Sequence, residues 1–184
     1  MAKLSTAAWI AHNLGIGASF GGLLFGKLAL NPNLDVISSE AERGKILNAA
    51  WNRYNIVNAL SVGTAAATWW AGRAAISGEA LDDEGRNLVL AKDALFIASA
   101  VTGLISILSG LSLARQAPEG ATPIETGTTP ASDTPEKAAS LLRRVNILGN
   151  LNLILIASIG AITTILSQKA GKSTRWSAIS RFLP

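Results

Sequence analysis

A single histidine, His12, is the side chain of this chain best suited to acid–base or ligand chemistry near neutral pH. There is no cysteine, so the sequence excludes disulfides, thiolate nucleophiles and cysteine-ligated metals. One histidine also excludes motifs that need two, such as a bis-histidine haem or an HExxH zinc site. A serine hydrolase needs a base beside its nucleophile. We therefore expect a protein that is not an enzyme and that binds no metal.

His12 follows Ala8 at a spacing of four. This Ala-x-x-x-His pattern resembles that of light-harvesting helices, in which the histidine ligates a chlorophyll magnesium and the alanine leaves room for the ring. The alternative is a histidine hydrogen-bonded to a threonine or glutamine where two helices meet. No cofactor is predicted apart from a possible pigment or lipid at His12. We expect this side chain to lie level with Thr68, Thr164, Ser167 and Gln168.

The segment that carries His12, residues 4–26, contains no Asp, Glu, Lys or Arg. A bilayer's hydrocarbon core takes roughly 20 apolar residues to cross as a helix, so this segment can span. The chain is 49% hydrophobic and 15% charged, against about 25% charged in soluble domains. We expect one all-α integral membrane domain over residues 1–184. Three further neutral runs complete its four spans, at 54–72, 94–114 and 145–168.

Small residues recur at spacings of three and four in these runs, which places them on one face of each helix. Left-handed helix packing uses the same seven-residue repeat, and small side chains let helices approach closely. We therefore expect a left-handed four-helix bundle with the small faces inward. The helix-packing residues are Gly15, Ser19, Gly22, Gly26, Gly103, Ser106, Gly110 and Gly160.

Asparagines occur near the start of the second and fourth runs. Both runs start on the same side of the membrane, so these amides should lie at one depth and bond to one another or to water. They could line a polar path, but structural pairing is the favoured interpretation because no run contains a proline or a charge. No run contains an acid either, so a pH-sensing role of His12 is disfavoured. The asparagines are Asn55, Asn58, Asn146, Asn150 and Asn152.

The segments outside the spans differ in composition. Residues 116–135 are rich in Pro, Thr, Gly and Ala, and we expect a flexible surface loop there. Residues 169–184 hold four basic residues and no acid, which predicts a basic interfacial tail on anionic headgroups. That tail favours termini in the cytoplasm of a bacterial cell with the spans in its plasma membrane. The net charge of +4 is scattered among loops, so nucleic acid is not an expected partner.

Several short segments follow one another in a family-like order. Residues 42–45 read Glu-Arg-Gly-Lys and lead through Trp-Asn-Arg-Tyr at 51–54 into the second run. The last run begins Leu-Arg-Arg-Val-Asn-Ile-Leu at 142–148, and the first contains Gly21-Gly22 with Pro32 soon after it. This order resembles the TMEM205-like (DUF4149) family of small four-helix membrane proteins over most of the chain. The resemblance implies four spans and no established enzymatic activity, and it names no catalytic residue.

The function expected from these features is that of a non-enzymatic accessory or scaffold subunit in a larger membrane complex. Its bulky helix faces suit lipids and other integral membrane subunits, and its small faces suit internal packing. A small transporter or permeation protein that uses the asparagines is the first alternative, and it should show a continuous polar path. A pigment-binding subunit through His12 is the second, and it should purify coloured.

Overall fold

The computed structural model describes residues 2–76 and 83–171, and every structural statement below concerns these residues. Three short turns connect the long helices: the π-helical η1 (Gly26–Leu30) and the 3-10 turns η2 (Pro32–Val36) and η3 (Pro118–Gly120). The prediction of an all-α chain with four long helices is confirmed. The long helices are α1 (Ala2–Phe25), α2 (Glu40–Ile76), α3 (Asp83–Ala114) and α4 (Glu136–Gly171).

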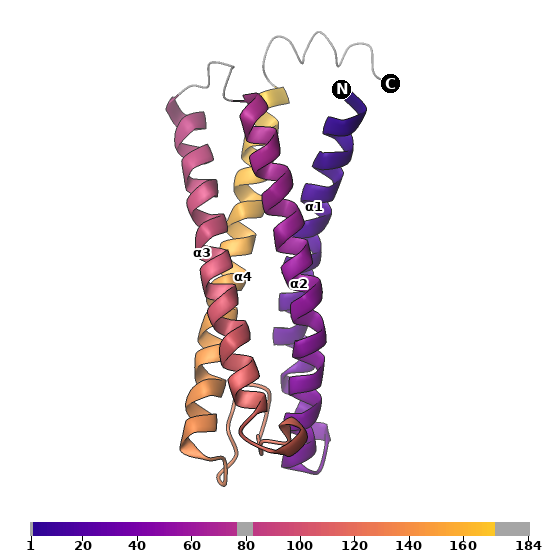
Figure 1. The fold of residues 1–184 in the computed structure, drawn as a ribbon, viewed down its shortest axis with the longest axis vertical. Helices are drawn as coiled ribbons and strands as arrows, with labels where there is room; N and C mark the ends of the chain where they lie inside the picture. Colours follow the sequence, from indigo (N-terminus) through magenta and orange to yellow (C-terminus); the bar gives the residue numbers. More distant parts are fainter. Residues whose placement is uncertain (1, 77–82, 172–184) are drawn as a thin grey trace.

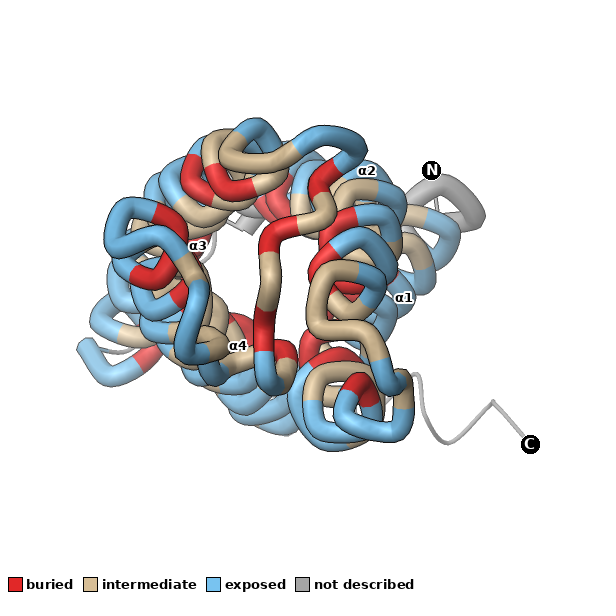
Figure 2. The backbone as a smooth tube through the Cα atoms, turned by 90° about the horizontal axis from the view of Figure 1, so that it is seen from below, coloured by how far each residue is buried: buried red, intermediate tan, exposed pale blue. Residues whose placement is uncertain are grey.

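The four helices form two antiparallel hairpins that stand side by side (Figure 1). α1 packs mainly on α2, and α3 packs mainly on α4. The hairpins meet through smaller contacts of α1 with α4 and of α2 with α3, so that the helices form a ring when seen end-on (Figure 2). α1 begins and α4 ends at the same end of the bundle (Figure 1). α1 and α3 lie on opposite sides of the ring (Figure 2).

The bundle is apolar outside and carries polar side chains inside. Leu14 and Leu60 are each 67% exposed, and Ile154 is 63% exposed. Ten polar or charged residues of the described chain are buried, among them Asn58 and Asn152. A soluble protein rarely exposes such an extended apolar surface. Three helical segments, Thr6–Val36, Asp83–Ala114 and Glu136–Lys169, are long and apolar enough to cross a membrane, as a multi-pass membrane protein requires.

The expected second span, 54–72, lies within α2, and α2 is not one of those three segments. The helix is long enough, but its first turns are charged and its neutral half contains amides, threonines and two tryptophans. The amides, threonines and tryptophans lower the hydropathy of this half of α2 without adding charge. The fourth span therefore stays a prediction.

The small residues of α1 lie where α1 and α2 approach most closely. A Cβ atom added to Gly15 would lie 2.5 Å from the carbonyl oxygen of Ser61. A Cβ added to Gly22 would overlap the ring of Tyr54, and one added to Gly26 would overlap the ring of Trp51. The close contact of these two helices therefore depends on the missing side chains.

Residues 116–135 fold over the lower end of the bundle, and we call them the cap loop. Seen from below, the connection crosses the centre of the ring (Figure 2). Ile124 is only 1% exposed and belongs to a second apolar cluster with Leu34, Leu47, Leu113 and Leu142. The loop differs in this from the loosely held surface segment expected from its composition. One apolar side chain, packed among residues distant in sequence, holds it in place.

Hydrogen bonds reinforce this docking. The amide of Ile124 donates to the carbonyl of Glu40 at 3.2 Å, and the amide of Gly127 donates to the carbonyl of Asn31 at 2.9 Å. On the surface, Lys45 of α2 forms an ion pair with Glu119. The hydrogen bond of this pair raises the pKa of Lys45 and lowers the pKa of Glu119. The expected basic tail, 169–184, lies for the most part outside the described residues.

We predict that Gly44→Ala destabilises the protein and that Gly63→Ala does not. A Cβ at Gly44 would overlap the backbone carbonyl of Thr122 in the cap loop, whereas one at Gly63 meets nothing within 4 Å. Overpacking of this kind costs about 1–3 kcal/mol. Gly63→Ala should be neutral or stabilising by up to about 1 kcal/mol, because alanine favours helix. Thermal unfolding in detergent measures both variants, and equal midpoints for the two would contradict the docked position of the cap loop.

Candidate functional site

His12 lies in the centre of the bundle beside a lysine, Lys92 of α3. The two side chains meet across the ring, with Lys92 Nζ 2.9 Å from His12 Nε2. Lys92 has an exposure of 0% and His12 of 1%. Thr163 of α4 lies 3.4 Å from the same ring nitrogen, and Thr68 of α2 lies 3.4 Å from Nδ1. We call these four residues the polar centre, and it draws one side chain from each long helix.

The hydrogen bonds of His12 define its tautomer. Its Nδ1 lies 2.7 Å from the backbone carbonyl of Ala65, which can only accept, so Nδ1 carries a hydrogen. In the neutral imidazole Nε2 is then an acceptor. Lys92 is its donor, because the Thr163 hydroxyl donates to the carbonyl of Ile159 at 2.7 Å. With both ring nitrogens engaged, this geometry disfavours ligation of a pigment magnesium by His12.

Aromatic rings enclose the polar centre. The indole of Trp9 stacks on His12 at 5.5 Å between ring centroids, and Phe96 meets the imidazole edge-on. Lys92 Nζ lies 3.8 Å from the centre of the Trp69 ring, a cation–π contact that favours a positive charge there. Trp69 Nε1 donates to a carboxylate oxygen of Asp93 at 2.8 Å, which fixes the ring in place.

Lys92 was missed in the sequence because the neutral run was taken to begin at residue 94. α3 in fact begins at Asp83, so Lys92 lies well inside the helix. A signal was present, because Lys92 lies seven residues before Ser99, on the inward face of α3. The depth expected for His12 fits both helices, because Thr68 and Thr163, the neighbour of Thr164, contact the ring. Thr164, Ser167 and Gln168 are exposed and do not bond to it.

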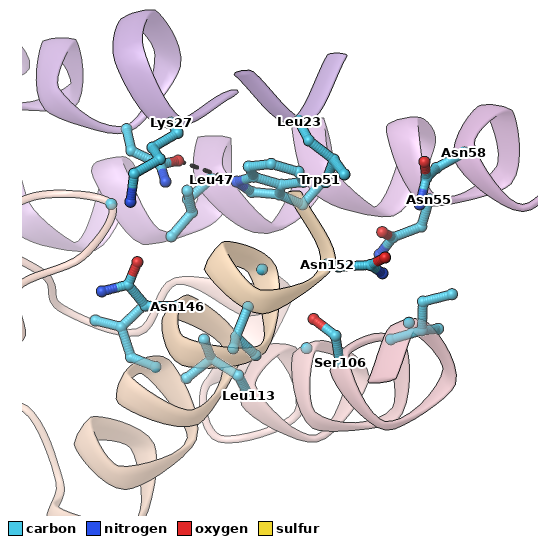
Figure 3. Close-up of a pocket in the computed structure, with 18 of the residues that line it drawn as sticks. Leu23, Lys27, Leu47, Trp51, Asn55, Asn58, Ser106, Leu113, Asn146 and Asn152 are labelled. Atoms are coloured by element: carbon cyan, nitrogen blue, oxygen red, sulfur yellow. Dashed lines mark hydrogen bonds between the residues drawn. The ribbon is translucent and has the colours of Figure 1, made fainter. Parts of the chain in front are cut away.

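A cavity of about 90 Å³ lies in the opposite half of the bundle, between the two hairpins. All five asparagines singled out in the sequence line it, together with Asn31, Asn48 and Asn52. Figure 3 shows Asn55, Asn58 and Asn152 gathered at one end of the cavity, with Lys27 and Asn146 at the other. The eight amides make it strongly hydrogen-bonding, and its other lining residues are mainly glycine and apolar side chains.

The asparagines divide into paired and unpaired groups. Asn58 accepts a hydrogen bond from Ser19 at 2.6 Å, and Asn152 accepts one from Ser99 at 2.6 Å. Asn150 accepts from Lys27. Asn52, Asn55 and Asn146 differ, because no side-chain hydrogen bond joins any of them to the described part of the protein. These three amides are half-buried and are therefore available to water or to a ligand.

Lys27 is the one charged residue among those that line the cavity. The lining contains no carboxylate, and the described chain contains no group of three or more His, Cys, Asp or Glu that could hold a metal ion. Amides can donate and accept, but an ammonium only donates. The cavity is therefore suited to a neutral or anionic occupant.

The expected packing residues of α3 do not close the interface between the hairpins. Ser106 and Gly110 line the cavity, and a Cβ on Gly110 would meet nothing within 4 Å. Gly103 also lines it, beside the amide of Asn152. On α4, Gly160 lies against Ile16 at ordinary contact distance. Small residues thus pack the α1–α2 hairpin tightly and leave space between the hairpins.

An apolar layer separates the cavity from the polar centre. It consists of fully buried side chains from three helices, and no hydrogen bond between the described side chains joins the two sites. Its central members are Ala65, Phe96, Ile156 and Ile159.

We predict that Ser19→Ala destabilises the bundle by about 0.5–2 kcal/mol, the range found for hydrogen bonds between buried helices. Its hydroxyl is fully buried and bonds α1 to α2 through Asn58. Ser158→Ala is the matched control, because that hydroxyl bonds only the carbonyl of Ile154 in its own helix. Chemical unfolding in mixed micelles measures both variants, and a loss as large for Ser158→Ala would refute the assignment.

No family model, curated protein or solved structure matches this chain. The resemblance to the TMEM205-like family thus stays an expectation that rests on its motifs. The function has to be inferred from the geometry of the cavity and of the polar centre.

Proposed function

We propose that this chain is a multi-pass membrane protein that binds a small polar solute in its asparagine-lined cavity. Within the described residues the static bundle has no continuous polar path, so passage of the solute requires the apolar layer beyond the cavity to open. The observation that carries the proposal is a cavity with eight asparagines, of which Asn52, Asn55 and Asn146 make no side-chain hydrogen bond within the described part of the protein. A side-chain amide inside an apolar bundle is costly unless it is bonded. Amide side chains that line a cavity and have no partner in the protein therefore favour a site that forms hydrogen bonds with a solute.

Embedding in a membrane is supported by the apolar outer surface and by the topology. α2 runs back along α1 between the end of one apolar helix and the start of the next (Figure 1). If α1, α3 and α4 cross the bilayer, α2 crosses it too. The three- and four-residue spacing of the small residues favours left-handed packing of the four spans. The start of α1 and the end of α4 then lie on the same side of the membrane, which we assign to the bacterial cytoplasm.

The size of the cavity limits the solute. About 10–15 Å³ of cavity volume is enough to hold one water molecule, so the cavity of about 90 Å³ has room for several waters or for one small solute. Lys27 and the absence of a lining carboxylate favour neutral and anionic solutes over cations.

An accessory subunit is the function first expected from the sequence, and its apolar faces would suit partner helices as well as lipid. An accessory role does not explain why the cavity is lined by amides without hydrogen-bond partners. Co-purification of other membrane subunits after gentle extraction, without solute flux, would favour it over the present proposal.

The test uses three planar solutes of four non-hydrogen atoms each: nitrate, urea and guanidinium. We expect proteoliposomes to admit nitrate or urea faster than empty liposomes do, and to admit guanidinium slowest, as light scattering after an osmotic step would show. Asn146→Leu should slow entry about 2- to 12-fold, the equivalent of one hydrogen bond of 0.5–1.5 kcal/mol.

Asn13→Leu is the matched control, because Asn13 is exposed on α1 and lies outside the cavity lining. It should leave entry unchanged. Rates no faster than those of empty liposomes for all three solutes would contradict the proposal. Fastest entry of guanidinium would contradict the charge argument.

A further inference from the structure

Lys92 is a buried ionisable group that the solute cavity does not use. Its exposure is 0%, and the neighbouring outward residue Leu90 is exposed and apolar. Burial of an ammonium is costly unless it is partnered. In the described part of the chain Lys92 takes part in no ion pair, and its close partners are His12 Nε2 and the face of Trp69. An ionisable residue at such a position is a candidate functional site.

We propose that Lys92 and His12 together form a proton-binding site, in which one proton is shared between Lys92 Nζ and His12 Nε2. This site lies beyond the apolar layer from the cavity and does not depend on the proposed solute. Its ligand is the proton itself. The neutral runs contain no acid, and the ionisable neighbour of His12 is instead a lysine, Lys92, 2.9 Å away.

Both positions of the proton satisfy the hydrogen bonds of the site. With the proton on lysine, the ammonium donates to a bare Nε2, and Nδ1–H donates to the carbonyl of Ala65. When the proton moves along the 2.9 Å hydrogen bond, lysine becomes a neutral amine and His12 an imidazolium. Nε2–H then donates to the lone pair of Nζ, and the bond to Ala65 is kept. The total charge is unchanged, and no heavy atom has to move.

The surroundings stabilise a positive charge at either end. The face of Trp69 favours the charge on Nζ. The carbonyl of Ala65 and the hydroxyl oxygen of Thr68 favour it on the imidazole. A positive charge therefore has a stabilising neighbour at each end of the Lys92–His12 hydrogen bond, as proton sharing requires.

Few other charges face the site from the helices packed around it. α1 contributes His12, and among the described side chains of α2 and α4 the contacts are the uncharged Thr68, Trp69 and Thr163. On α3 the nearest charge is Asp93, which is half-buried and accepts from Trp69. Near the end of the bundle, Glu84 and Lys169 pair with each other at 2.6 Å. The proton is thus held mainly by the two nitrogens.

The test uses nitrogen NMR of His12. The chain contains one histidine, so protein labelled with ¹⁵N-histidine and purified with a histidine-free tag gives ring signals from His12 alone. We expect Nδ1 to resonate as a protonated nitrogen. We expect Nε2 to resonate between the positions of a bare and a protonated imidazole nitrogen, because it holds the proton part of the time.

Lys92→Arg separates proton sharing from a simple hydrogen bond, because a guanidinium keeps the donor and the charge but does not release its proton. In this variant Nε2 should move to the position of a bare acceptor. Lys92→Met, which has neither donor nor charge, gives the reference position of a bare Nε2, and a wild-type Nε2 signal at that position would also overturn the proposal. Lys169→Met should leave the ring signals unchanged. An Nε2 signal that is the same in the wild type and in the folded Lys92 variants would overturn the proposal.

Discussion

The bundle depends on one constraint, that polar side chains in an apolar interior must find partners on other helices. In the described part of the chain, no buried side-chain nitrogen or oxygen lacks a partner. Ser19 bonds α1 to α2, Ser99 bonds α3 to α4, and Lys92 bonds α3 to His12 of α1. Leaving such a group unpaired costs about 1–3 kcal/mol. Sliding one helix past another by a turn would break these pairs, so they set the register that apolar contacts alone would leave loose.

The same constraint explains where the bundle is open. Within the first hairpin, Gly15 and Gly22 bring α1 against α2, and no space remains. Between the hairpins, Gly110 and Gly149 face a gap with nothing within 4 Å, and the gap is lined by amides. A cavity of this kind is stable when its walls can bond water or a solute, whereas an apolar one would stay dry. Glycine thus allows close helix contact within the first hairpin and leaves open space between the two hairpins.

Sequence patterns predicted most of this arrangement and failed at two kinds of place. The inward faces of the asparagines follow from helical periodicity, which is local in the chain. Asn55, Asn58 and Asn152 share a depth, as expected from the order of the spans, whereas Asn146 lies at the other end of the cavity (Figure 3). Sequence reasoning misses Lys92, because the neutral run begins only after this charge, although Lys92 continues the inward face of α3. The docked cap loop could not be predicted, because Ile124 is held by residues distant in sequence and its own neighbours show no periodicity.

The two proposed sites lie on opposite sides of a single apolar layer formed by Phe96, Ile156 and Ile159. A solute that entered the cavity could go further only if the hairpins moved apart at that layer. The same movement would separate His12 of α1 from Lys92 of α3, because these side chains join the two hairpins directly. The proton they share would then have to remain on one of them. Opening for the solute and confinement of the proton to one of the two nitrogens would therefore be one event, which is the physical requirement for coupling the two.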